Sequence, residues 1–148
     1  MVNKLLLVLH LLGSSIWVGG HLVMAIRVLP KALKQRDPAI IAGFEAVFEK
    51  IGIPALLLQI ATGIGLAYQF TINLFDVFDF EAGPHAMIAL KLILLLATLI
   101  IAAHARIRLI GKLTETNLSF LAWHIRMITV LAVAMLVFGA GVRLGGWW

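Results

Sequence analysis

Four long apolar stretches constrain the fold of this chain more than any other feature. They cover about residues 4–26, 51–70, 86–109 and 121–142, and each has roughly the 20 residues that a helix needs to cross about 30 Å of hydrocarbon. The stretches are uniformly apolar rather than alternating, which argues against membrane-spanning strands. A chain of 148 residues that is 62% hydrophobic and 13% charged cannot hide this surface from water. The sequence therefore predicts an all-α integral membrane four-helix bundle, with residues 1–148 forming a single transmembrane domain.

The distribution of lysine and arginine predicts the orientation. The connections after the first and third stretches are basic, whereas the connection between the second and third contains Asp76, Asp79 and Glu81 and no basic residue. The positive-inside rule places basic connections in the cytoplasm, so both termini and the acidic connection are expected on the periplasmic side of a bacterial inner (cytoplasmic) membrane. The net charge of +5 then reflects topology and indicates no nucleic-acid partner. The basic residues concerned are Arg27, Lys31, Lys34, Arg36, Lys50, Arg106, Arg108, Lys112 and Arg126.

Two histidines of the first stretch, His10 and His21, lie eleven residues apart. Eleven steps of about 100° make almost three helical turns, so both rings leave one face of the helix, roughly 16 Å apart along its axis. An imidazole in lipid is costly unless something binds it. The pair therefore predicts two metal centres, one in the outer leaflet at His10 and one in the inner leaflet at His21. The alternative for each ring is a hydrogen bond to a carbonyl or hydroxyl group.

Haem b is the expected cofactor of these centres, with one haem at each level. Neutral imidazole is its usual axial ligand, and the absence of cysteine excludes disulfides, thiolate metal sites and iron–sulfur clusters. At the inner level, we expect His21 to pair with His104 or with His124, and His104 is preferred because it lies slightly deeper in its span.

At the outer level, the expected partner of His10 is His85 or Lys91. Lys91 lies about six residues inside the third stretch, and its separation from His104 matches the spacing of His10 and His21. Lys91 and His104 are about 140° apart around the helix, which predicts different neighbours for them. Instead of binding iron, Lys91 could extend toward the headgroups or pair with a haem propionate, and we favour this alternative.

Three further residues of the first stretch are candidates for cofactor contact. Gly13 and Gly20 flank the histidine face and would leave space for a flat macrocycle, although glycine in membranes more often lets a neighbouring helix pack closely. Trp17 lies on the histidine face between the two rings, where it would stack against a porphyrin or pack in the bundle. A copper site is the weaker alternative, with His85 and Met87 as a soft imidazole–thioether pair.

Short motifs are distributed over most of the chain, namely Leu9-His10, Trp17-Val18-Gly19-Gly20, Leu29-Pro30, Pro54-Ala55 with Gly63, Lys91 and His104. Together these motifs resemble CopD-like membrane proteins and their relatives in the HemJ group.

This resemblance implies a helical membrane bundle of four or more spans. HemJ proteins are associated with haem b and oxidise protoporphyrinogen IX, and His10 and Lys91 match their important histidine and lysine. CopD proteins are associated with copper uptake or resistance. The chain departs from the HemJ pattern where His124-Ile125-Arg126 stands in the fourth stretch, and His21 is absent from that pattern. These departures favour a second haem.

These observations predict a membrane b-type cytochrome with two haems that transfers electrons across or within the membrane. The spans contain no obvious catalytic carboxylate or nucleophile, so electron transfer, or quinone chemistry at a haem edge, is favoured over hydrolysis. The alternatives are a HemJ-like protoporphyrinogen IX oxidase and a CopD-like copper transport protein. Gly139, Gly141 and Gly145 near the end of the fourth stretch would permit close contact between the protomers of a homodimer.

Overall fold

The structure is a computed structural model that describes residues 2–71, 73–79 and 84–144, so Glu81 and Gly145 lie outside the described residues. Within these ranges the regular structure is helical throughout. Four helical segments are long and apolar enough to cross a membrane, which confirms the predicted all-α four-helix architecture. Helices suit this solvent because each satisfies its own backbone hydrogen bonds, which lipid cannot do.

The first span is longer than the sequence predicts. Helix α1 (Val2–Val23) continues through the π-helical segment η1 (Met24–Val28) into α2 (Leu29–Gln35). The helix ends at Arg36, which adopts a left-handed conformation with φ of 52°. The side chain of Asp37 then accepts a hydrogen bond of 2.9 Å from the backbone N–H of Ala39, where the next helix begins.

The remaining spans are single helices. Helix α3 (Ala39–Ala67) begins well before residue 51, so the second span is longer than the sequence predicts. Helices α4 (Pro84–Arg108) and α5 (Leu118–Leu144) lie within a few residues of the predicted stretches. Short 3-10 segments occupy the connections, namely η2 (Leu74–Asp79), η3 (Ile110–Lys112) and η4 (Glu115–Asn117).

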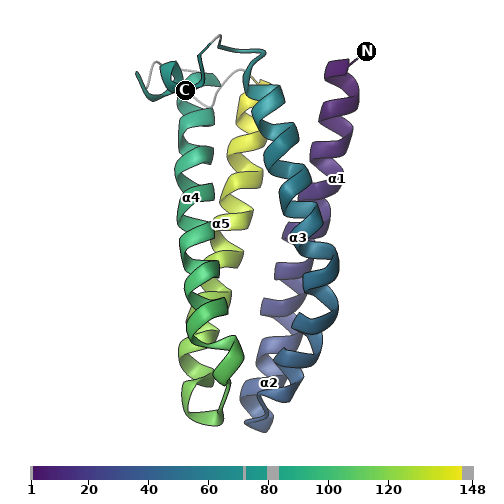
Figure 1. Cartoon of the computed structure of the whole chain (residues 1–148), viewed down its shortest axis with the longest axis vertical. Helices are drawn as coiled ribbons and strands as arrows, with labels where there is room; N and C mark the ends of the chain where they lie inside the picture. Colours follow the sequence, from purple (N-terminus) through teal and green to yellow (C-terminus); the bar gives the residue numbers. More distant parts are fainter. Residues whose placement is uncertain (1, 72, 80–83, 145–148) are drawn as a thin grey trace.

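The four spans form two closely packed pairs (Figure 1). Helix α1 packs mainly against α3, α4 packs mainly against α5, and the two pairs meet chiefly where α1 contacts α5. The beginning of α1 and the end of α5 lie at one end of the bundle, which we call the terminal half. The opposite end, which we call the basic half, contains α2 and the connection between α4 and α5.

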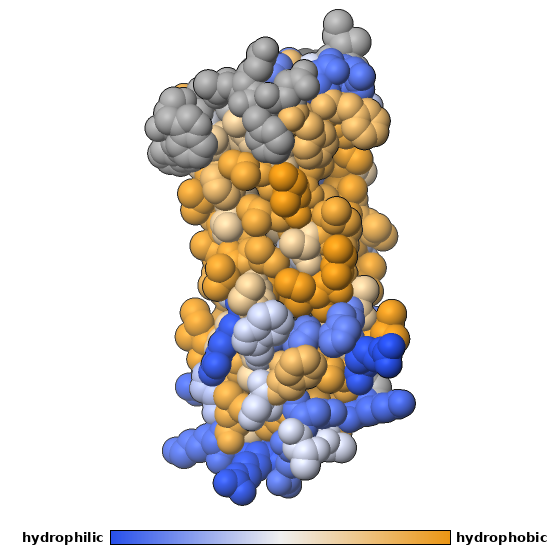
Figure 2. All heavy atoms as spheres, turned by 90° about the vertical axis from the view of Figure 1, so that its left-hand side faces the viewer, coloured by the Kyte–Doolittle hydropathy of each residue, from blue (hydrophilic) through white to orange (hydrophobic). Residues whose placement is uncertain are grey.

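The surface has the polarity of a membrane protein. Hydrophobic side chains cover the middle of the face in Figure 2, and hydrophilic side chains gather at the α2 end. Large apolar side chains in the middle of the spans remain more than half exposed, for example Leu57, Leu96 and Val130. Such exposure on several helices indicates lipid as the solvent of this surface, and the chain is a multi-pass membrane protein.

Candidate functional site

A cavity of about 420 Å³ lies in the terminal half and is lined by all four spans. This volume is within the range of small-molecule and cofactor sites. Most of the lining is aliphatic, and a few polar or sulfur-containing side chains interrupt it. These are His10 and Ser14 from α1, Gln59 from α3, Lys91 from α4, and Met135 and Arg143 from α5.

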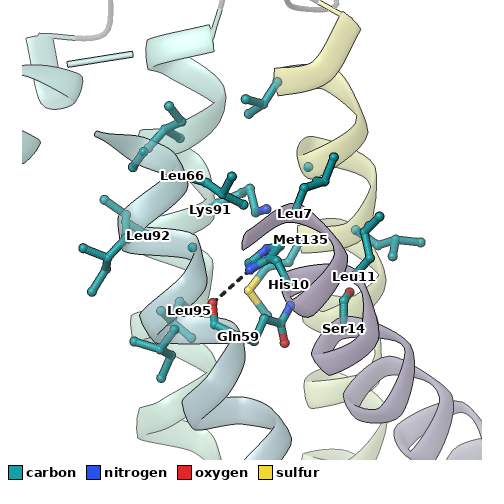
Figure 3. Close-up of a pocket in the computed structure, with 18 of the residues that line it drawn as sticks. Leu7, His10, Leu11, Ser14, Gln59, Leu66, Lys91, Leu92, Leu95 and Met135 are labelled. Atoms are coloured by element: carbon teal, nitrogen blue, oxygen red, sulfur yellow. Dashed lines mark hydrogen bonds between the residues drawn. The ribbon is translucent and has the colours of Figure 1, made fainter. Parts of the chain in front are cut away.

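His10 is held in a defined orientation at the wall of this cavity (Figure 3). Its Nδ1 lies 3.0 Å from the backbone oxygen of Gln59 and 3.0 Å from Oγ1 of Thr62. Because the carbonyl oxygen only accepts, Nδ1 is the donor, and Nε2 carries the lone pair. Nε2 has no hydrogen-bond partner among the described residues. Metal-binding histidines commonly have this arrangement, with one nitrogen donating to a carbonyl and the other left for the metal.

Glycine on the facing helix makes room for the His10 ring. A Cβ atom at Gly63 of α3 would lie 3.0 Å from Cε1 of His10 and 3.5 Å from its Nδ1. Any larger residue at this position would therefore press on the imidazole. The resemblance included Gly63 only as part of a motif, and its role becomes visible only once α1 and α3 are packed together.

Lys91 enters the same cavity from α4, so the structure brings together the two residues predicted at the outer level (Figure 3). A Cβ atom at Gly139 of α5 would lie 2.9 Å from Nζ of Lys91, so this glycine leaves space for the amine. Lys91 has no ion pair or hydrogen bond with another described residue. His85, the alternative partner of His10, instead donates from Nε2 to the backbone oxygen of Phe70 at 2.8 Å.

Three residues of the cavity were not predicted as part of a cofactor site. Gln59 lies near His10, and its side-chain oxygen Oε1 is buried without a hydrogen-bond partner. Met135 is buried in the wall contributed by α5, and Arg143 lies toward the end of that helix. Gln59 is distinguished in the sequence as a polar residue near the middle of its span, which needs a partner there. No sequence pattern distinguishes Met135 and Arg143, because their role depends on which face of α5 turns toward α1.

In the basic half, His21 is partly buried and packs against aromatic side chains. Its Nδ1 donates to the backbone oxygen of Trp17 at 2.9 Å, one turn earlier in α1. The ring centroid lies 4.4 Å from that of Trp17 and 5.5 Å from that of Phe48, which meets it edge-on. Trp17 itself is 7% exposed and packs in the bundle core, and its Nε1 has no hydrogen-bond partner. His21 is not among the residues that line the cavity.

The two glycines of α1 accommodate neighbouring protein atoms. A Cβ atom at Gly20 would lie 2.0 Å from Cε2 of Phe48, so the phenyl ring occupies the space expected for a macrocycle. A Cβ atom at Gly13 would lie 2.9 Å from the backbone oxygen of Ala55. Both glycines therefore have the alternative role, in which a small residue lets α3 approach α1 closely.

The two remaining histidines bind each other rather than His21. Nδ1 of His104 lies 2.9 Å from Nε2 of His124, and the rings stack with centroids 5.0 Å apart. Nδ1 of His124 donates to the backbone oxygen of Phe120 at 3.0 Å, so its Nε2 accepts from His104. His104 and Lys91 thus both approach α5, which corrects the expectation of different neighbours. The four methylenes of Lys91 let its amine bend toward Gly139 despite the angular separation.

Other metal arrangements find little support in the described ranges. No group of three or more His, Cys, Asp or Glu side chains there is placed to hold a metal ion. Met87 is fully buried, whereas His85 is only partly buried and hydrogen-bonded to the backbone. The proposed copper pair therefore has no geometric feature in its favour.

The cavity and the residues around it fit one haem at His10. An oriented imidazole with a free Nε2 and aliphatic walls are features that a bound haem would need. At His21 the corresponding space is occupied by Phe48, so the surrounding residues do not fit a second haem.

Comparison with known proteins does not assign this chain to a family. No protein-family model, no curated protein and no solved structure matches this chain. The resemblance to CopD-like and HemJ proteins stays a prediction, and the interpretation of the site rests on its own geometry.

Proposed function

We propose that this chain is an integral membrane haem b protein, in which Nε2 of His10 would hold one haem in the cavity of the terminal half. The observation that carries the proposal is that His10 lines the cavity, with its Nδ1 bound to a backbone carbonyl while Nε2 has no partner among the described residues. When bound, haem b would supply a one-electron redox centre. The protein would then exchange electrons with a redox partner or a quinone.

The residues of the cavity have distinct parts in this proposal. The carbonyl of Gln59 fixes the tautomer and the orientation of the His10 ring, which would also strengthen the ligand. The aliphatic walls exclude water, and this environment would tune the redox potential. Gly63 leaves room for the His10 ring to pack against α3.

The orientation follows from charge. Hydrophilic side chains gather at the α2 end (Figure 2), and the basic residues of α2 and of the end of α4 lie in that half. The positive-inside rule assigns this half to the cytoplasm. In a bacterial inner membrane, the cavity and both termini would then lie toward the periplasm. Electron exchange would take place on that side.

The second haem predicted from the sequence has less support. It would require His21 to turn a free nitrogen toward an open space, and Phe48 fills the space beside Gly20. It would also require His104 or His124 as a partner, and these two rings bind each other. We therefore propose one haem per chain.

The test is the visible spectrum and haem stoichiometry of the protein purified from haem-replete cells. Reduced protein should show b-type bands, and a pyridine haemochromogen assay should give close to one haem per chain. A colourless preparation would contradict the proposal. A value close to two would contradict the single site and restore the di-haem interpretation.

A HemJ-like protoporphyrinogen IX oxidase is the second candidate. The observation that favours it is the convergence of His10 and Lys91 on one cavity, since these are the residues that match the important pair of that family. This candidate predicts rescue of a strain that lacks protoporphyrinogen oxidase, and loss of rescue in both His10→Ala and Lys91→Ala. Haem binding without rescue would contradict the oxidase candidate, and the electron-transfer interpretation would remain.

A further inference from the structure

We infer that Lys91 and Arg143 form a carboxylate-binding subsite at the terminal end of the cavity. The ligand class would then be an apolar molecule that carries carboxylate groups at one edge. The inference rests on the proposed function, in which these groups are the propionates of haem. It assigns Lys91 to the carboxylates and leaves the iron to other ligands.

The first observation is an imbalance of charge in the cavity. Lys91 and Arg143 both line it, and no aspartate or glutamate is among its described lining residues. The Nζ of Lys91 lies 2.9 Å from the Cβ position of Gly139, and Arg143 follows Gly139 by about one turn of α5. The ion pair found in the described ranges joins Arg106 to Glu49, and both of these residues lie outside the cavity.

The second observation is the position of the lysine amine. The Nζ of Lys91 lies beside Gly139 of α5, the neighbouring helix, and both residues line the cavity. A cation among aliphatic walls without a partner costs free energy, and a bound anion removes that cost. Lysine binds carboxylates as a point charge, and arginine adds a planar, bidentate donor.

The third observation is the order of residues along α5. Met135, Gly139 and Arg143 follow one another at intervals of four residues, so they share one helix face and are separated by about 6 Å of rise per step. All three line the cavity. The cationic end of the cavity is therefore at Arg143, two turns of α5 beyond Met135, which lies beside His10 (Figure 3). A macrocycle beside His10 would direct its acidic edge toward the end of α5.

The direct test compares haemin with haemin dimethyl ester, in which both propionates are neutral. Full-length protein produced without haem is titrated with each in detergent, and the Soret band reports binding. We expect the ester to bind about tenfold to a hundredfold more weakly, since it loses charge-assisted hydrogen bonds. Lys91→Gln and Arg143→Gln should each weaken haemin binding and leave ester binding unchanged.

Two variants serve as controls. Lys4→Gln removes an exposed charge from α1 in the same half of the bundle, outside the cavity, and should not alter the preference for haemin. Lys91→Arg keeps the charge and should retain most of the preference. Helix content measured by circular dichroism shows whether each variant is folded.

The outcomes separate this inference from the proposed function. Equal binding of both compounds, with a spectrum that depends on His10, would overturn the subsite and leave the haem site intact. A changed axial-ligand spectrum in Lys91→Gln would make Lys91 an iron ligand and also overturn the inference. If neither compound binds to folded protein, the haem proposal fails and the subsite falls with it.

Discussion

The terminal and basic halves of the bundle each present a histidine from the same face of α1, but the surroundings of the two rings differ. In both cases Nδ1 lies within hydrogen-bond distance of a backbone carbonyl, of Gln59 for His10 and of Trp17 for His21. Beside His10 the facing helix has a glycine and a cavity follows, whereas beside His21 it has a phenyl ring. The neighbouring helix therefore determines how much space lies beside each histidine ring.

Helix α3 provides both environments along its length. Near its beginning, Phe44 and Phe48 stack with ring centroids 5.6 Å apart, and Phe48 fills the space over Gly20. Near its end, Gly63 and Gly65 approach residues of α1 with no side chain of their own. Along one helix, therefore, aromatic rings fill the space beside α1 in the basic half, whereas glycines let side chains of α1 pack against α3 in the terminal half.

The largest expected difference between the halves is in haem content. His10→Ala removes the proposed axial ligand and should abolish nearly all bound haem. His21→Ala removes a ring held among protein side chains and should leave the haem content per chain close to that of the wild type. Pyridine haemochromogen assays on both purified variants measure this. A loss of about half the haem in His21→Ala would contradict the asymmetry between the two halves.

A smaller effect is expected when only the clearance beside His10 is reduced. In Gly63→Ala the new methyl group would lie 3.0 Å from Cε1, so the ring or α3 has to shift. We expect haem affinity to fall about tenfold, as for the loss of about 1.4 kcal/mol. Gly19→Ala is the matched control, because nothing lies within 4 Å of its Cβ position. Equal affinities in both variants would show that Gly63 does not define the site.

The sequence predicts the spans well because the thickness of the membrane sets their length and their apolar composition. It also predicts that His10 and His21 share one face of a helix, since the helical repeat depends on nothing beyond that helix. The pairing of faces between helices is not encoded in this way. The spacing within α1 contains no information that Gly63 lies beside one ring and Phe48 beside the other.

The same limit applies to the third and fourth spans. The angular separation of Lys91 and His104 predicts different neighbours, yet both reach α5, because a long side chain can bend around its helix. The mutual hydrogen bond of His104 and His124 depends on the register of α4 against α5. The charge pattern and the apolar periodicity of the sequence do not determine this register.

In the basic half, substitution should change stability rather than haem content. Gly20→Ala would place a methyl group 2.0 Å from the Phe48 ring, which has to move. Such overpacking costs about 1–3 kcal/mol, so the midpoint of thermal unfolding should fall while haem per folded chain is unchanged. Gly43→Ala has open space around its Cβ position and should be neutral or slightly stabilising. Loss of haem in folded Gly20→Ala protein would indicate that the halves are coupled.

The smallest effect is expected at the paired histidines. His104→Ala removes the donor to Nε2 of His124, a residue that is only 3% exposed. Because an unsatisfied buried acceptor is costly, the free energy of unfolding should fall by about 1 kcal/mol. Ile107→Ala, at an exposed position of the same helix, controls for side-chain loss at the surface. The haem spectrum should be identical in both variants, because the pair lies in the opposite half of the bundle from the cavity. A shifted spectrum in His104→Ala alone would show that this pair acts on the haem and that the division between the two halves is not functional.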